Sequence, residues 1–319
     1  MKRALITGIS GFVGGYLGEE LLAQGYELHG TCFGDRERMR RGLRCQLHEM
    51  NLCDEKNVRQ VISEVNPHRV FHLAAQSSAA LSWKKPKLTM EINLCGAVNL
   101  LEAIRTTCPE SSVLMIGSSE EYGKISASAP RVDENYPLFP TNPYAISKMA
   151  QESLSVLYAR SYGLNIVMTR AFNHIGPGQS DQFVVPSFAH QLACIELGRQ
   201  EPVIRVGNLS ARRDFTDVRD VVRAYVALSD HGTSGEVYNI GTGHSHSIDE
   251  ILKTLIKISK LDVEIEVDPA RLRPSDTPEI ICDCRKLKAI SGWEPIIPLE
   301  QSLNDILEDF RAQETQQSS

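Results

Sequence analysis

Short apolar runs alternate with longer segments of helical periodicity through the first half of the chain. The runs span 4–7, 27–33, 69–74, 113–117 and 165–170, and the segments between them span 12–24, 55–65, 89–107 and 143–162. In the second of these segments apolar residues recur three and four positions apart, as expected for one buried helix face. Strands that alternate with helices predict an α/β fold with a doubly wound parallel sheet, covered by helices on both faces.

The size and charge of the chain exclude several classes of protein. Its 319 residues suffice for about two domains. Lys and Arg number 34 and Asp and Glu number 40, a net charge of −6 with scattered basic residues, which disfavours a nucleic-acid binder. No stretch approaches the roughly 18 consecutive apolar residues of a membrane span. The N-terminal run is too short for a signal peptide, so we expect a cytoplasmic protein.

The eight cysteines favour a reduced protein without metal. Most of them lie in apolar or strand-like contexts and are expected to be small core residues, as for Cys32, Cys53, Cys95, Cys194 and Cys282. Two possible ligand groups, Cys282 with Cys284 and the trio Cys45, His48 and Cys53, lack a second half at the spacing of a zinc finger. We therefore predict no metal site.

A glycine-rich loop follows the first predicted strand and opens the first predicted helix. Its glycines at 8, 11 and 14 permit a tight turn, close approach of backbone amides to a pyrophosphate, and close packing of helix on strand. The loop predicts dinucleotide binding. At the end of the second strand Asp35 would bind a ribose 2′-hydroxyl, whereas Arg36 or Arg38 would receive a 2′-phosphate, so the choice between NAD and NADP stays open.

The alternation of strands and helices changes after residue 172. A Gly-Pro-Gly turn at 176–178 precedes a predicted helix at about 186–197 and a polar loop at 207–214, and a strand at 236–240 is predicted to rejoin the sheet. We predict a dinucleotide-binding domain of residues 1–172, rejoined by about 215–245. Residues 173–214 and 246–312 then form a smaller C-terminal substrate-binding lobe. Residues 313–319 have no apolar side chain and are expected to be a frayed tail.

Tyr144 and Lys148 are candidate catalytic residues. They lie four residues apart at the start of a helix that Asn142 caps and Pro143 begins, so they share a helix face. A neighbouring ammonium lowers the pKa of a phenol from about 10, which would make Tyr144 an acid or base near neutral pH. The spacing alone also fits a surface pair on an amphipathic helix.

The strand that ends near residue 117 adds two further candidates. Ser118 can hydrogen-bond the oxygen that Tyr144 protonates, and Glu120 can act as a second acid or base. Both follow a strand at the carboxyl edge of the predicted sheet, where open parallel sheets bind ligands.

Taken together, these segments resemble the extended short-chain dehydrogenases/reductases that modify nucleotide sugars, a family with a Rossmann sheet. The resemblance covers essentially the whole chain, and it includes the segments 72–76 and 212–218 and Asn93. Three segments are most similar to the GDP-4-dehydro-6-deoxy-D-mannose reductases that form GDP-D-rhamnose: 117–123, 172–179 and 271–275. The GDP-mannose 4,6-dehydratases are their nearest relatives.

The resemblance implies a role for individual residues. Ser118, Tyr144 and Lys148 would form the catalytic set, and NADPH or NADH would be the cofactor. The implied cofactor-binding residues are Gly8, Gly11, Phe12, Val13, Gly14, Asn51, Leu52, Leu73, Ala74, Ala75, Tyr144 and Lys148. Many relatives have an aspartate at the position of Asn51. The implied contacts to the GDP-sugar substrate are Ser118, Asn173, Arg213 and Arg273, since guanidinium groups suit a diphosphate. Pairing of two copies through 89–107 and 143–162 is expected.

Four functions remain open on the sequence alone. A reductase would protonate the C4 carbonyl oxygen of the keto sugar with Tyr144, while Glu120 contacts the sugar. A 4,6-dehydratase would instead use Glu120 as the base at C5, although such enzymes usually have threonine at the position of Ser118. Another nucleotide-sugar epimerase or reductase is less favoured, as is a regulator that binds dinucleotide without turnover, because such regulators commonly lose the Tyr or the Lys.

Overall fold

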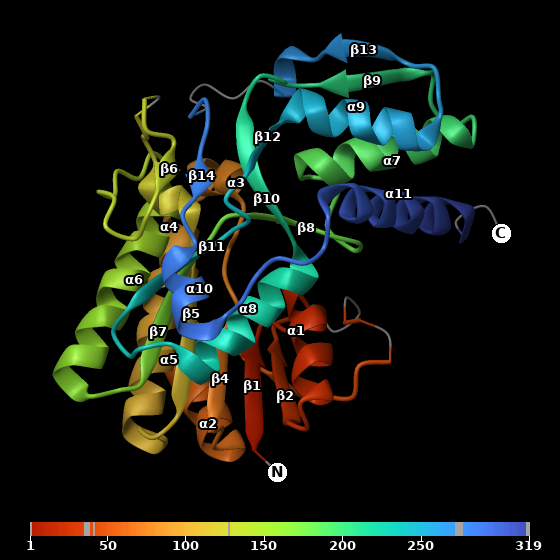
Figure 1. The fold of residues 1–319 in the computed structure, drawn as a ribbon. Helices are drawn as coiled ribbons and strands as arrows, with labels where there is room; N and C mark the ends of the chain where they lie inside the picture. Colours follow the sequence, from red (N-terminus) through yellow and green to blue (C-terminus); the bar gives the residue numbers. More distant parts are fainter. Residues whose placement is uncertain (1, 35–38, 41, 127, 272–276, 317–319) are drawn as a thin grey trace.

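A seven-stranded parallel sheet forms the centre of the molecule (Figure 1), which confirms the predicted fold class. The structure, a computed structural model, describes residues 2–34, 39–40, 42–126, 128–271 and 277–316. The strand order is β11-β7-β5-β4-β1-β2-β3. These strands span Arg3–Thr7 (β1), Glu27–Cys32 (β2), Gln46–Glu49 (β3), Arg69–His72 (β4), Ser112–Ser118 (β5), Ile166–Ala171 (β7) and Val237–Ile240 (β11).

Helices cover both faces of this sheet, as Figure 1 shows. One face packs against α2 (Glu55–Val65), α5 (Gly96–Thr107) and α6 (Pro143–Tyr162), and the other against α1 (Phe12–Ala23) and α8 (Val218–His231). The helix α10 (Arg285–Ser291) contacts α8 and β11, so this late segment lies with the sheet and not with the second lobe. Two apolar cores, one on each face, hold the layers together.

A second lobe has a core of its own, between α7 (Val184–Glu196), α9 (Ile248–Ser259) and α11 (Leu299–Gln316). Smaller sheets complete the fold. Their strands are β8 (Asn173–Ile175), β9 (Val203–Val206), β10 (Arg212–Asp217), β12 (Ser245–Ser247), β13 (Glu264–Val267), β6 (Arg131–Val132) and β14 (Ile281–Cys282). The short helices elsewhere are α3 (Ala79–Lys84), α4 (Pro86–Met90), a 3-10 turn (Ser119–Tyr122) and a second 3-10 turn (Pro269–Arg271).

The predicted helix at 89–107 is present, but it contains a π-helical turn. A π-helical turn at Glu91–Cys95 separates α4 from α5. Asn93, in this turn, is fully buried, accepts a hydrogen bond from Gln76 N at 2.8 Å and donates to Gln76 O at 3.0 Å and Ser147 Oγ at 2.9 Å. The bulge thus turns one side chain inward to fix the loop after β4 beside α6.

The prediction of a frayed tail is wrong for residues 313–316. The helix α11 continues to Gln316. Glu314 is 6% exposed and forms an ion pair with Arg199 and a hydrogen bond with His190. A charged side chain therefore anchors this end, where the sequence offers no apolar residue. No described helix is long and apolar enough to cross a membrane.

The cysteines differ in part from the prediction. All eight are free, but Cys53 and Cys95 are exposed and are not core residues. Cys45, His48 and Cys53 do not form a cluster of potential metal ligands among the described residues. Among the described residues one such cluster is found, His190, Cys194 and Glu314, in which Glu314 is already paired with Arg199.

Candidate active site

A cavity of about 1400 Å³ lies at the carboxyl edge of the large sheet. The strand order reverses here, between β1 and β4, which is where open α/β sheets bind their ligands. All the predicted site residues that the structure describes line this cavity. They are Gly8, Gly11, Phe12, Val13, Gly14, Asn51, Leu52, Leu73, Ala74, Ala75, Ser118, Glu120, Tyr144, Lys148, Asn173 and Arg213. The predicted residues Asp35, Arg36, Arg38 and Arg273 lie outside the described part of the chain.

The glycine loop is shaped as dinucleotide binding requires. Gly8 has φ +71°, and a Cβ at this position would lie 2.9 Å from Ala74 Cα. A Cβ at Gly14 would lie 2.4 Å from Ile9 O. Gly11 caps α1 without a side-chain hydrogen bond, so the first amides of this helix face the cavity without competition from a capping side chain. The residues present therefore fit the pyrophosphate of a nicotinamide dinucleotide.

Ser118 and Glu120 follow β5 directly into the cavity wall. The Ser118 hydroxyl accepts a hydrogen bond from Glu120 N at 3.2 Å. The exposed carboxylate of Glu120 accepts one from Asn142 Nδ2 at 2.8 Å. Asn142 also caps α6, because its Oδ1 accepts from Ala145 N at 2.8 Å. One amide side chain therefore links Glu120 to the helix that carries Tyr144, a link that the sequence analysis missed.

Tyr144 and Lys148 are both buried, but their electrostatics differ from the prediction. Burial and the nearby Glu120 carboxylate raise the pKa of Tyr144 above its usual value. A hydrogen bond with Ser118 acts in the opposite direction and lowers it. Lys148 is not among the groups that shift this pKa, and its Nζ donates to Ile116 O at 2.7 Å and to Gln151 Oε1 at 3.2 Å. The predicted lowering of the phenol pKa by Lys148 is therefore wrong for the protein alone. Tyr144 is instead held in its protonated form.

The predicted sugar-nucleotide contacts come from the connection between the lobes. Asn173 is exposed in the cavity at the start of β8. Arg213, on β10, donates to Arg212 O and Thr277 O, both at 2.8 Å. The next residue, Asp214, is fully buried and accepts from Thr242 N and Gly243 N at 2.8 Å each, so it holds the strand rather than the ligand. Of these two neighbouring residues, only Arg213 lines the cavity.

Two buried polar groups in the cavity wall were not singled out from the sequence. Gln179 donates from Nε2 to His174 O at 3.0 Å, and its Oε1 has no partner among the described residues. The hydroxyl of Tyr225, on α8, likewise has no partner there. The sequence carries no local signal for Tyr225, because it lies on an ordinary helix face far along the chain from the other site residues.

Known proteins match this chain over nearly its whole length. A model of the family described as GDP-mannose 4,6 dehydratase matches residues 5–306. The chain belongs to this family. A family relative, GDP-6-deoxy-D-mannose reductase of Pseudomonas aeruginosa, is 35% identical over 311 residues, which cover 98% of each chain. GDP-mannose 4,6 dehydratase 2 of Arabidopsis thaliana is 31% identical and covers 97% of this chain and 86% of its own.

The fold comparison agrees with the family assignment. The structure of RMD from Pseudomonas aeruginosa complexed with NADPH has a TM-score of 0.86 and 33% identity, and the match covers 98% of this chain and all of that one. The resemblance predicted from the sequence is thereby confirmed at the level of the family. The chain is an NAD(P)-dependent enzyme of the short-chain dehydrogenase/reductase type.

Proposed function

We propose that the protein reduces the C4 ketone of GDP-4-dehydro-6-deoxy-D-mannose to give GDP-D-rhamnose, with NADPH or NADH as the reductant. The observation that carries this proposal is the buried Tyr144 phenol beside Ser118 in the cavity at the end of β5, where burial raises the pKa of the phenol and favours its protonated form. A reduction begins with a phenol that can donate a proton. An oxidation of the sugar, with which a dehydratase starts, needs the phenolate instead. The greater identity to the named reductase also supports the proposal.

Each residue has a definite task in this reaction. When bound, the nicotinamide supplies the hydride that reaches C4. Tyr144 donates its proton to the carbonyl oxygen, and the Ser118 hydroxyl donates a hydrogen bond to the same oxygen, which stabilises the developing negative charge by a few kcal/mol per donor. Lys148, buried in the cavity wall, orients the ribose of the cofactor. Asn173 and Arg213 contact the sugar nucleotide, together with Arg273, which lies outside the described residues.

A 4,6-dehydratase activity on GDP-mannose is the second candidate. It is favoured by Glu120, whose carboxylate lines the cavity two residues from Ser118 and is held by Asn142. In that reaction Glu120 would remove the C5 proton. The two candidates differ in their use of the cofactor, since only the reductase consumes it.

Supplying each substrate in turn tests the proposal. With the 4-keto-6-deoxy GDP-sugar and NADPH or NADH, we expect the absorbance of the reduced cofactor to fall in proportion to the product formed. Keto sugar formed from GDP-mannose with no net change in cofactor would instead support the dehydratase. Absence of turnover with both substrates would instead support a regulator that binds dinucleotide without turnover.

Replacing Glu120 with glutamine distinguishes the two roles of this residue. The amide keeps an acceptor for Asn142 but removes the base, so we expect reduction to fall less than tenfold, below the roughly 10²-fold that marks loss of a general base. The measurement is kcat for reduction of the keto sugar, beside wild type. A loss beyond 10²-fold would show that Glu120 takes part in the proton transfer.

Pairing of two copies also stays a proposal. The helix α6 leaves Ile146, Leu157 and Tyr162 exposed by 41%, 56% and 54%, which is consistent with the predicted contact through this helix.

A further inference from the structure

The buried face of α6 carries a row of polar side chains where an ordinary amphipathic helix has apolar ones. The row consists of Tyr144, Lys148, Gln151 and Ser155, and each of these residues is at most 9% exposed. Residues three and four positions apart share one face of a helix, and α6 packs on β5 and β7. Buried polar groups are costly unless they are hydrogen-bonded, so each side chain of the row requires a partner.

Gln151 has no task in the proposed reaction, yet both ends of its amide are engaged beside Lys148. It is 1% exposed, its Oε1 accepts a hydrogen bond from Lys148 Nζ at 3.2 Å, and its Nε2 donates to Ile116 O at 3.3 Å. The Nζ of Lys148 donates to the same Ile116 O at 2.7 Å. Gln151, Lys148 and Ile116 therefore form a closed triangle of hydrogen bonds between α6 and β5, just before Ser118.

This triangle sets the direction of the Lys148 ammonium. An ammonium group has three N–H donors. Two of them are taken by Ile116 O and Gln151 Oε1, and no further acceptor is found for the third among the residues that the structure describes. Lys148 and Ile116 line the cavity, whereas Gln151 is not among the lining residues. The two acceptors thus hold the ammonium from the protein side and leave one donor for a ligand.

The order of groups along a nicotinamide dinucleotide indicates which part of it this donor would meet. A ribose joins the pyrophosphate to the nicotinamide ring. The glycine loop fits the pyrophosphate, and Tyr144 and Ser118 line the cavity where the ring would react. The hydroxyl groups of the ribose between them are hydrogen-bond acceptors, and Lys148 lies one helical turn from Tyr144.

We propose that Gln151 is a positioning residue that, together with Ile116 O, holds two of the three N–H donors of Lys148, so that the third is aimed at the ribose hydroxyls of the nicotinamide half of the cofactor. The inference rests on the proposed function for the task of Lys148 at the ribose. It adds to the site a residue that acts on the cofactor through Lys148.

Gln151→Met tests this role in cofactor binding. Methionine is unbranched like glutamine, but it has no N–H donor and its thioether is only a weak acceptor. The ammonium would then be held by Ile116 O alone, and its third donor would no longer be fixed. We expect the dissociation constant for NADPH, from fluorescence titration without any sugar, to rise about tenfold, as for one misaligned hydrogen bond from a charged group.

Gln151→Glu is the rescue variant. The carboxylate keeps an acceptor for Lys148 Nζ at the same reach, although it cannot donate to Ile116 O. We expect its dissociation constant for NADPH to stay within about threefold of the wild-type value, because hydrogen bonds between an ammonium and a carboxylate are strong. An affinity in Gln151→Glu as low as in Gln151→Met would overturn the role of Gln151 as the acceptor for Lys148.

A fragment of the cofactor localises the effect. 2′,5′-ADP is part of the adenosine half of NADPH and lacks the nicotinamide ribose, so its dissociation constant, from calorimetry, should be the same in wild type and Gln151→Met. Equal weakening of both ligands would show a general disturbance of the cavity and would overturn the inference, as would wild-type binding of NADPH. Gln151→Leu, a second apolar replacement, should repeat the selective loss and decides the question if Gln151→Met does not fold.

Gln191→Met is the matched control. Gln191 lies on α7, is 9% exposed, and likewise uses both ends of its amide, which accepts from Arg205 N at 2.8 Å and donates to Arg205 O at 3.2 Å. It is not among the residues that line the cavity. The variant loses a buried amide in the same way, but it should bind NADPH as wild type does. A loss of affinity equal to that in Gln151→Met would overturn the inference.

Measurements with and without sugar separate this inference from the proposed function. A wild type that does not turn over the keto sugar, together with selective weakening of NADPH binding in Gln151→Met, would overturn only the proposed function. Reduction of the keto sugar by wild type, together with unchanged NADPH binding in Gln151→Met, would overturn only the inference. We expect turnover by wild type and a KM for NADPH that rises in Gln151→Met with the dissociation constant.

Discussion

Replacing Tyr144 with phenylalanine should lower kcat for reduction of the keto sugar by about 10²- to 10⁴-fold, the usual contribution of a positioned general acid. The substitution removes only the hydroxyl that donates the proton, and the ring stays packed in a site where Tyr144 is 9% exposed. The dissociation constant for NADPH should change little, because the glycine loop and the segment after β4 remain. Stopped-flow or steady-state absorbance of the cofactor gives kcat, and fluorescence titration gives the dissociation constant.

Tyr162→Phe is the control for this prediction. Tyr162 lies at the other end of α6, is 54% exposed, and contacts Arg105 rather than the cavity. The same loss of a hydroxyl there should leave kcat unchanged. Activity in Tyr144→Phe within twofold of wild type would show that another group protonates the carbonyl oxygen.

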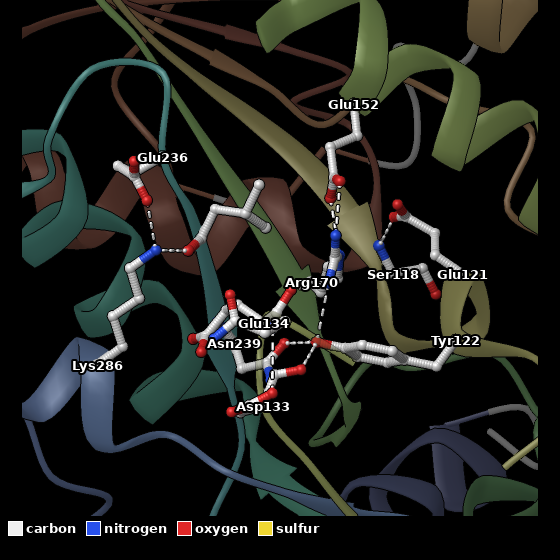
Figure 2. Close-up of polar contacts among 12 residues, drawn as sticks. Ser118, Glu121, Tyr122, Asp133, Glu134, Glu152, Arg170, Glu236, Asn239 and Lys286 are labelled. Atoms are coloured by element: carbon white, nitrogen blue, oxygen red, sulfur yellow. Dashed lines mark hydrogen bonds and ion pairs between the residues drawn. The ribbon is translucent and has the colours of Figure 1, made fainter. Parts of the chain in front are cut away.

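Replacing Arg170 with methionine should lower the free energy of unfolding by about 3–5 kcal/mol, because it leaves a buried carboxylate without its cation. The guanidinium holds Glu152 by two hydrogen bonds and also donates to Tyr122 OH at 3.1 Å and Glu134 O at 3.0 Å. Figure 2 shows Arg170 between Glu152 and Tyr122. Denaturation in urea, followed by circular dichroism, measures the change.

An exposed arginine–glutamate ion pair is the control for the stability change in Arg170→Met. Arg59 contacts Glu55 at 3.3 Å on α2, with side chains 51% and 63% exposed. Arg59→Met should therefore cost less than about 0.5 kcal/mol. Equal losses in the two variants would mean that the buried network below the active site adds no particular stability.

The parts of the site that the sequence predicted are those set by local geometry. The glycine loop requires a positive φ or a close backbone approach at specific positions. Each of these requirements can be recognised in the sequence, because glycine meets it best. The helix start at Asn142 and Pro143 is equally local, and the structure places it at the predicted position. The capping box of Ser118 and Glu121 also has a spacing that can be recognised in the sequence, a serine followed three residues later by a glutamate. Only Glu120 of that segment was predicted to have a role.

The parts that the sequence did not predict depend on distant partners. The π-helical turn within the helix at 89–107 is held by hydrogen bonds of Asn93 to Gln76 and Ser147. The edge strand β3 has a single apolar residue, Leu47, and so gives no strong alternation. The position of the Lys148 ammonium was also missed, because spacing on a helix shows which face a side chain shares but not that Ile116 O on the neighbouring strand will bind it.

The transfer of deuterium tests the central claim most directly. The protein would be given the 4-keto-6-deoxy GDP-sugar and NADPH fully deuterated at C4 of the nicotinamide ring, and the product examined by mass spectrometry and proton NMR. The account predicts one deuterium at C4 of the sugar for each cofactor oxidised, with the configuration of GDP-D-rhamnose. Oxidation of the cofactor without deuterium at C4, or formation of keto sugar from GDP-mannose with the cofactor unchanged, would contradict it.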